Sequence, residues 1–517
     1  MDLLSPDTAA RAAARFTKFR TGGGGRPRIP LSGRLLLLGC GSVSRCLQPL
    51  LLRHLDMDLS KLTVLDFDDR AVPDADLIRA GASLVRHRIT PDNLDATLRG
   101  RLGPGDLLVN LTWDIETGDL IQWCQDHGVL YVDTSVELWD NTFADHTGTA
   151  PTGRTLYVRH MDLRRRAAAW GPHGPTAVVE HGANPGLVSH WTKVALADIA
   201  TAMLAEPERL PAPLDPARRE RLEAALAAGD HARLAMETGT KVIHISERDT
   251  QISDRPKEVG EFVNTWSIAG FYEEGTATAE LGWGTHERRL PPGAHTHAAG
   301  PRNQICLARP GIDTYVRSWV PLGGQIEGMV IRHGEAFTIS DHLTVWDGDR
   351  PTYRPTVHYA YLPTDAAMAS LHECRMSGYR LQDRQRIMDD DIVSGADELG
   401  VLLLGHDLNG WWTGSQLDIK EARALVPHQN ATTLQVAASV LGAVAWMVRN
   451  PNRGFCVPDD LDHDQVLEVA GPYLGPCPSM PTDWTPLAQR GDPFEQVNGG
   501  RPRDQDVWQF ATFLTIR

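Results

Sequence analysis

The chain has 517 residues with 42% hydrophobic and 23% charged side chains, a composition typical of a globular protein with two or three domains. Its formal net charge of −15 argues against nucleic acid as a partner and suits a cationic ligand. Because we find no apolar run of about 18 residues and no signal-peptide core, we expect a cytoplasmic protein without a membrane span. The seven cysteines lack metal-ligand spacing, so we expect neither disulfides nor a metal site.

The chain begins with a predicted extension over residues 1–29, and its most informative stretch follows directly. Four consecutive leucines at 35–38 predict a short strand that is buried on both faces. This strand runs into a Gly-x-Gly-x-x-Ser turn that contains Gly39, Gly41, Ser42, Val43 and Ser44. Such a turn lets the backbone approach a pyrophosphate and directs the next helix N-terminus at its charge. We therefore predict a dinucleotide site, in preference to a glycine-rich turn without a ligand.

A second predicted strand, at 61–66, follows a helix expected at 45–56 and ends in Asp66. This acid lies 27 residues after Gly39, somewhat beyond the usual spacing of about 20. A carboxylate here can accept hydrogen bonds from both ribose hydroxyls and would repel a 2′-phosphate, so the sequence favours NAD over NADP. We expect Asp68 or Asp69 to cap the next helix instead.

Strand and helix signals continue to alternate along the first third of the chain. Further strands are predicted at 107–111, 130–133 and 177–180, with a helix at 116–127. This rhythm indicates an α/β fold with a Rossmann-type, doubly wound parallel sheet. We assign it to a nucleotide-binding domain at 30–185.

Beyond residue 186 the pattern changes to that of a second, mixed α+β domain at 186–420. A helical region is expected at 190–235, and strands are predicted at 241–245, 261–268, 279–283 and 325–331. The apolar helical region at 421–450 is expected to pack back on the first domain. The Pro- and Asp-rich tail at 451–517 is expected to be an irregular cover.

Polar side chains follow the predicted parallel strands, at the edge where open α/β sheets bind their ligands. These residues are Asn110, Thr112, Asp114, Thr134, Glu137 and the segment 180–186, which includes Asn184 and Pro185. Acids at this edge can hold an ammonium group, and the Asn184 amide can bind an amine or imine nitrogen. Taken singly, each residue could equally be a helix cap or a loop hydrogen bond.

The second domain contains aromatic and acidic side chains in close succession. Glu247 follows an apolar strand, and Trp266 and Glu274 lie in the strings NTWS and EEGTATAELGWGTHE. Recognition of a flexible diammonium requires such groups, because a cation over an indole gains roughly 0.5–2 kcal/mol. His333 and Glu335 offer a general acid/base pair. The alternatives are that Trp266 is a core residue and that His333 is structural.

Taken together, several strings of this sequence resemble the bacterial homospermidine synthases, relatives of saccharopine and carboxynorspermidine dehydrogenases. The matching strings are LLLLGCGSVSRCLQPLL at 35–51, HGANPGLVSH at 181–190, KVIHISERDTQ at 241–251, NTWS at 264–267, EEGTATAELGWGTHE at 273–287 and IRHGEAFTIS at 331–340. They agree in order over residues 30–340, which makes the resemblance specific.

The resemblance implies an NAD-dependent, redox-neutral cycle on diamines. NAD takes a hydride from a carbon beside one amine of putrescine, a second diamine displaces ammonia from the imine, and the hydride returns to give homospermidine. Spermidine is an alternative aminobutyl donor, with loss of diaminopropane. The resemblance also implies a homodimer whose substrate and dimer contacts come from 186–420, without nucleic acid, membrane or metal.

The resemblance also assigns roles to individual residues. Trp266 would stabilise the cationic amine or imine, Glu247 and Asn184 would bind its reacting end, and His333 would assist proton transfer. The residues expected to bind the rest of the substrate are Asp114, Glu137, Glu274 and Glu335. The residues expected to hold NAD are Gly39, Gly41, Ser42, Val43, Ser44, Asp66, Asn110, Thr112, Thr134 and Pro185.

Three other functions remain open from the sequence. A carboxynorspermidine- or saccharopine-type dehydrogenase would need an arginine for the substrate carboxylate, for which Arg248, Arg302 and Arg332 are available. That class usually prefers NADPH, which Asp66 disfavours. The chain could also be an NAD-binding scaffold without turnover, or could oxidise putrescine to an aldehyde as a side reaction.

Overall fold

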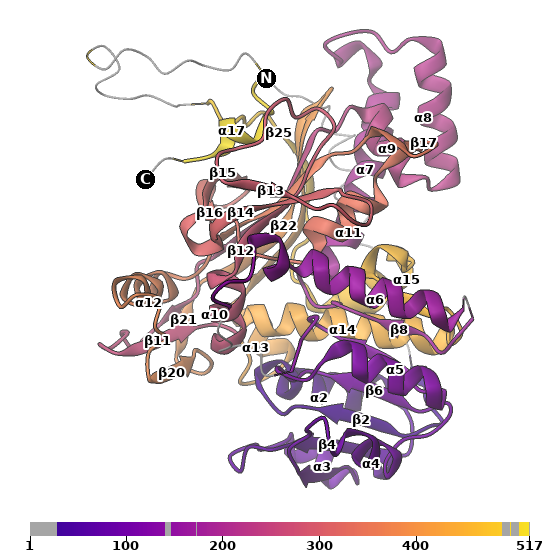
Figure 1. The fold of residues 1–517 in the computed structure, drawn as a ribbon, viewed down its shortest axis with the longest axis vertical. Coiled ribbons are helices and arrows are strands. Elements are labelled where there is room, and N and C mark those ends of the chain that lie inside the picture. Colours follow the sequence, from indigo (N-terminus) through magenta and orange to yellow (C-terminus); the bar gives the residue numbers. More distant parts are fainter. Residues whose placement is uncertain (1–27, 140–145, 172, 489–496, 498–505, 516–517) are drawn as a thin grey trace.

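The computed structural model describes residues 28–139, 146–171, 173–488, 497 and 506–515, and two large sheets dominate it (Figure 1). Almost all of the predicted extension at 1–29 lies outside these residues, as does much of the chain after 488. The predicted combination of a Rossmann-type parallel sheet and a mixed α+β domain is confirmed.

The first sheet contains seven strands, all parallel. In spatial order they are β24 (Phe455–Cys456), β8 (Ala177–Val178), β7 (Leu130–Asp133), β6 (Leu107–Asn110), β2 (Leu35–Leu38), β4 (Leu62–Asp66) and β5 (Ser83–Arg86). All four leucines of β2 are buried because the strand is central and both faces of the sheet are covered. The short strands β1 (Ile29–Pro30) and β3 (Leu55–Asp56) pair beside it.

The helices that follow these strands are α2 (Ser42–His54), α3 (Ala75–Arg79), α4 (Leu94–Arg99), α5 (Thr117–His127) and α6 (Leu156–Trp170). Helix α2 begins three residues earlier than predicted, because Gly41 already takes the N-cap position. The prediction that Asp68 or Asp69 caps the next helix is wrong. Asp74 caps α3 by accepting the Leu77 N–H at 2.9 Å, whereas Asp68 closes a turn onto Arg70.

The second sheet is mixed and has ten strands. Its main path is β13 (Ala294–Thr296), β14 (Gln304–Pro310), β12 (Thr278–Gly282), β19 (Thr356–Leu362), β9 (Val242–Asp249), β22 (Ala396–His406), β23 (Asn409–Asp418) and β25 (Ser479–Thr482). The hairpin β15 (Tyr315–Val320) and β16 (Gly324–Met329) joins it at β19. Strand β9 extends four residues past the predicted end, because β19 and β22 pair with its polar half.

Helices and short ribbons surround this sheet. The helices are α7 (Leu187–Ala205), α8 (Pro216–Ala228), α9 (His231–Thr238), α10 (Ile268–Thr276), α11 (Glu335–His342), α12 (Asp365–Met376) and α13 (Ile419–Leu425). The paired ribbons are β10 (Ile252–Ser253) with β21 (Ile392–Ser394), β11 (Glu261–Asn264) with β20 (Arg384–Ile387), and β17 (Val345–Asp347) with β18 (Arg350–Tyr353). The strand predicted at 261–268 is shorter, because Ser267 caps α10 through the Gly270 N–H.

Helix α14 (Ala431–Arg449) lies between the two sheets, shown in orange in Figure 1, and packs on α2, β7 and β22. The predicted return of this region to the first domain is therefore observed. The helix is long and apolar enough to cross a membrane, yet 89% of its apolar window is buried inside the protein. Such burial is typical of a core helix.

The expectation of an irregular cover after residue 451 is wrong for the part that the structure describes. Strand β24 completes one edge of the first sheet and β25 extends the second, with α15 (His463–Ala470) between them. The short helix α17 (Phe510–Phe513) places Phe510 and Phe513 in the core beside the second sheet. The tail is thus an integral part of both sheets.

Candidate active site

The glycine-rich turn opens a cavity of about 410 Å³ at the carboxyl end of β2. Gly39 and Gly41 line the cavity, while Ser42, Val43 and Ser44 form the first turn of α2. Gly39 has φ of 89°, and a Cβ there would lie 2.7 Å from the carbonyl oxygen of Leu111. Glycine is therefore required by both the backbone conformation and the close approach of the segment that follows β6.

Asp66 lines the same cavity and is tied to the turn. The Cys40 N–H donates to its Oδ2 at 2.6 Å, and the Asp68 N–H donates to its Oδ1 at 2.7 Å. Since each carboxylate oxygen has a second lone pair, the side chain still has capacity to accept from ribose hydroxyls. A carboxylate at the end of this strand disfavours a 2′-phosphate.

Of the polar residues at the end of β6 and after it, one lines this cavity and another holds it in place by a hydrogen bond. Asn110 is buried and accepts the Thr112 hydroxyl at 2.6 Å, and Thr112 lines the cavity. Asp114 adopts a left-handed φ of 57° in the following loop. It lies outside the lining of the cavities described here, so its predicted contact with substrate stays a prediction.

A second, small cavity of about 20 Å³ lies at the carboxyl ends of β7 and β8. Among the residues that line it are Thr134, Glu137, Pro185, Glu274 and His333, all of them predicted from the sequence. It shares Glu137, Arg159, Glu273 and Arg332 with a cavity of about 840 Å³ that opens beside α6. The two cavities are therefore neighbours that have these side chains in common.

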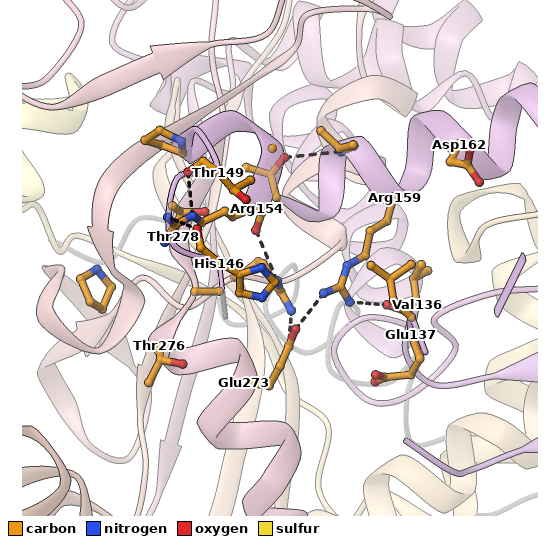
Figure 2. Close-up of a pocket in the computed structure, with 18 of the residues that line it drawn as sticks. Val136, Glu137, His146, Thr149, Arg154, Arg159, Asp162, Glu273, Thr276 and Thr278 are labelled. Carbon is orange, nitrogen blue, oxygen red and sulfur yellow. Dashed lines mark hydrogen bonds and ion pairs between the residues drawn. The ribbon is translucent and has the colours of Figure 1, made fainter. Parts of the chain in front are cut away.

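Glu273 is the centre of a buried ion network between the two cavities. Arg159 donates to Glu273 at 2.8 Å and to the carbonyl of Val136 at 2.7 Å, and Figure 2 shows both contacts as dashed lines. Arg332 binds the other oxygen of Glu273. Burial opposes ionisation of this carboxyl, but Arg332 and Arg159 outweigh it and lower its pKa to about 2. The network joins α6, α10 and the loop before α11.

His333 is held between two carboxylates. Its Nε2 lies 3.1 Å from Oε2 of Glu274, and its Nδ1 lies 3.3 Å from Oε1 of Glu335. Burial disfavours the imidazolium, but Glu335 and Glu274 raise the pKa of His333 well above its ordinary value. The predicted pairing of His333 with Glu335 is therefore present, and Glu274 joins it.

Glu247 and Asn184 meet although they are 63 residues apart, with the Asn184 amide donating to Glu247 at 3.1 Å. The Tyr359 hydroxyl donates to the same carboxylate oxygen. Burial raises the pKa of Glu247 to about 7 despite these hydrogen bonds. Asp249 and Asp397 lie near on β9 and β22, where burial raises their pKa values too.

Trp266 lies on the loop between β11 and α10, and its Nε1 donates to the Tyr361 hydroxyl at 3.1 Å. Tyr361 stacks on Tyr359 with 5.1 Å between the ring centroids, and Tyr359 lies 4.5 Å from the His333 ring. The two tyrosines thus connect Trp266, Glu247 and His333. Neither tyrosine was predicted from the sequence. They are two residues apart, and this spacing puts both side chains on the same face of β19.

Two comparisons with sequence families cover most of the chain. The model described as saccharopine dehydrogenase NADP binding domain matches residues 35–178, and that of the saccharopine dehydrogenase C-terminal domain matches 182–479. Homospermidine synthase of Blastochloris viridis is 42% identical over 94% of this chain and 98% of its own length. That of Mesorhizobium japonicum is 39% identical over 94% and 96%.

The chain belongs to the homospermidine synthase family. The crystal structure of homospermidine synthase from Legionella pneumophila in complex with NAD has a TM-score of 0.82 to this fold and 36% identity. The match covers 95% of this chain and 99% of that one. Members of the homospermidine synthase family are enzymes, and the two sheets described above are their shared architecture.

Proposed function

We propose that this chain converts two molecules of putrescine, or putrescine with spermidine as aminobutyl donor, into homospermidine, with NAD as a retained cofactor. The observation that carries the proposal is family membership over nearly the whole chain. The clustering of buried acids, His333 and Trp266 beside the carboxyl ends of the first sheet supports it.

The residues of the first sheet suit NAD. Gly39, Gly41 and the first turn of α2 would hold the pyrophosphate, and Asp66 would hold the ribose hydroxyls. Thr134 and Pro185 would lie at the reactive end, since both line the small cavity. When bound, NAD supplies a hydride acceptor that later acts as donor, so net turnover does not consume it.

The chain's own side chains would bind and orient the amines. Glu247 and Asn184 would hold the reacting nitrogen, and Trp266 would face the cation that forms there without offering a competing nucleophile. Glu137, Glu274 and Glu335 would attract the remaining ammonium groups. His333 would move protons between the nitrogen and Glu274.

The alternative of a carboxylated imine substrate is less well supported. It requires an arginine that is available for the substrate carboxylate. Arg332, which faces the cavity, is engaged by Glu273, and Arg248 donates to the carbonyl of Gly323 at 3.2 Å. The cavity acids would in addition repel an anionic substrate.

An isotope experiment tests the retained cofactor. Putrescine with deuterium on both terminal carbons is incubated with the enzyme, NAD and an excess of unlabelled NADH in solution. We expect homospermidine that keeps all of its deuterium, because the bound cofactor returns the same atom. Loss of one deuterium per product, or an aldehyde in place of the triamine, would contradict the proposal.

We also propose that the chain acts in the cytoplasm as a homodimer and that the large cavity admits the diamine. The seven cysteines are all free and buried, which suits a reducing compartment. Light scattering of the purified protein should give twice the chain mass of 56.9 kDa. A monomer mass at working concentration would contradict the dimer.

A further inference from the structure

A second buried pair of carboxylate and histidine lies beside His333. Glu180 follows β8, lines the small cavity and is only 2% exposed. Its Oε2 accepts a hydrogen bond from Nε2 of His160 at 2.8 Å, and its Oε1 accepts none from the described residues. His160 on α6 is fully buried, and its Nδ1 has no hydrogen-bond partner in the described part of the chain.

The backbone fixes this carboxylate at the strand edge. Glu180 has a left-handed φ of 56°, which is unfavourable for a residue with a Cβ and is typical of functional sites. Asp133 accepts its backbone N–H at 2.7 Å. Any Cβ on Gly334 would overlap the Glu180 carboxylate, so the loop that carries His333 packs directly against it. The side chain is therefore held in one place beside the cavity.

Most of the other charged groups around the small cavity have a charged partner, whereas Glu137 accepts a hydrogen bond from the Ser135 hydroxyl at 2.8 Å. These other charged groups are Asp133 on β7, Glu137, Arg159 and His160 around α6, Glu273 and Glu274 on α10, and Arg332, His333 and Glu335 before and in α11. Glu273 is neutralised by two arginines, whereas Glu274 and Glu335 share His333. Glu180 instead has His160 as the partner of one oxygen, and its side chain lines the cavity.

We propose that Glu180 is the base that takes the proton from the ammonium end of the bound diamine, an assignment that rests on the proposed function. One N–H bond of the ammonium breaks and an O–H bond forms on Glu180, which leaves a neutral amine. The adjacent carbon then loses hydride to the oxidised nicotinamide, and the nitrogen lone pair forms the C=N bond. The carbon is oxidised by two electrons and the nicotinamide is reduced by the same two.

The same proton is returned at the end of the cycle. The second diamine enters as an ammonium, and its nitrogen passes two protons to the departing nitrogen, one before and one after the new C–N bond forms. The departing nitrogen leaves as an ammonium ion. Hydride return converts the new iminium into a neutral secondary amine, and the O–H of Glu180 then protonates it. Two ammonium reactants thus give one secondary ammonium and one free ammonium ion, and charge balances. His160 is the positioning residue, because it orients the carboxylate through Nε2.

The test is a single turnover with full-length, NAD-loaded protein mixed with putrescine, in which reduction of the bound cofactor is followed from pH 6 to 10. We expect Glu180→Gln to slow this step by roughly 10²- to 10⁴-fold and to make it rise more steeply with pH, because only diamine that is already deprotonated can then react. The affinity for NAD, measured by calorimetry, should stay unchanged. Glu180→Ala should regain rate in proportion to added formate, a small base that fits the vacated space. His160→Gln should show a smaller loss with the pH dependence of the wild type, because the carboxylate base is still present.

Glu287→Gln is the matched control, because Glu287 is a buried acid that binds the Phe510 N–H far from the cavity. It should leave the single-turnover rate as it is in the wild type. A wild-type rate and pH profile in Glu180→Gln would overturn the assignment, as would a loss in Glu180→Ala that formate does not restore. If the wild-type protein itself fails to oxidise putrescine, the proposed function fails instead.

Discussion

Trp266 is the residue whose role depends most on the identity of the substrate. Its indole is anchored by Tyr361 and tilted 38° against Phe271 at 5.3 Å, so the ring has a defined orientation. A cation over such a face gains roughly 0.5–2 kcal/mol, and more when it is desolvated. The ring therefore contributes to catalysis only if a cation forms against it.

Trp266→Ala should accordingly lose most of the activity with putrescine, whereas Trp266→Phe should keep part of it. Steady-state rates of homospermidine formation measure both. Trp346→Ala is the control, because Trp346 is an exposed tryptophan that faces Arg354. Equal, near-wild-type rates in both Trp266 variants would remove the cation–π role.

Glu247 should also affect stability in a pH-dependent way. Burial raises its pKa to about 7 in the folded chain, so between its ordinary pKa and about 7 the folded state binds more protons than the unfolded state. The free energy of unfolding of the ligand-free protein should therefore fall as pH rises through this window. In Glu247→Gln, the decrease in the free energy of unfolding between pH 5 and 8 should be smaller than in the wild type by roughly 1–3 kcal/mol. Urea unfolding at pH 5 and 8 measures it, and an identical fall in wild type and variant would contradict the prediction.

At the scale of elements, the turn between β2 and α2 is the part that the sequence predicts best. Its signals are local: four leucines, then glycines at a fixed spacing. The Tyr359 and Tyr361 contacts and the network around Glu273 could not be predicted in this way. They join residues 59 to 114 positions apart, which come together only through the pairing of β9 with β19 and the ion pairs that link α6, α10 and the loop before α11.

Gly39→Ala tests whether the turn is a cofactor site. An alanine would need a left-handed φ and would crowd the Leu111 carbonyl, which shifts the turn that should hold the pyrophosphate. We expect NAD affinity to fall by about tenfold or more in calorimetric titration. Gly100→Ala should leave it unchanged, since that glycine lies at the exposed end of α4 in a right-handed helical conformation. Wild-type affinity in Gly39→Ala would contradict a cofactor site at this turn.

At the scale of the whole molecule, the segment after residue 451 contributes a strand to each of the two sheets. Strand β24 pairs with β8 although about 280 residues separate them, and a strand of two residues leaves no pattern that sequence analysis can detect. The composition of the segment after residue 451, which is rich in Pro and Asp, instead predicts irregular structure. The expectation for this region failed because its order comes from distant partners.

The substitution Phe513→Ala measures how much the C-terminal segment contributes to the stability of the fold. The ring is fully buried and lies 4.8 Å from His244 and 6.3 Å from Trp484. Its loss should cost roughly 3–5 kcal/mol in urea unfolding, as is usual for a buried phenylalanine. Val259→Ala, at a side chain that is 87% exposed, should change the stability little. A change below about 1 kcal/mol in Phe513→Ala would show that the segment is not part of the core.

We infer that this chain catalyses a redox-neutral cycle on two diamines, and a single incubation can decide whether it does. Purified protein is incubated with putrescine and an amount of NAD far below that of the diamine, while NADH absorbance is followed and products are analysed by mass spectrometry. We expect homospermidine in large excess over the added NAD with no net accumulation of NADH. Steady NADH accumulation without the triamine, or neither product, would contradict it.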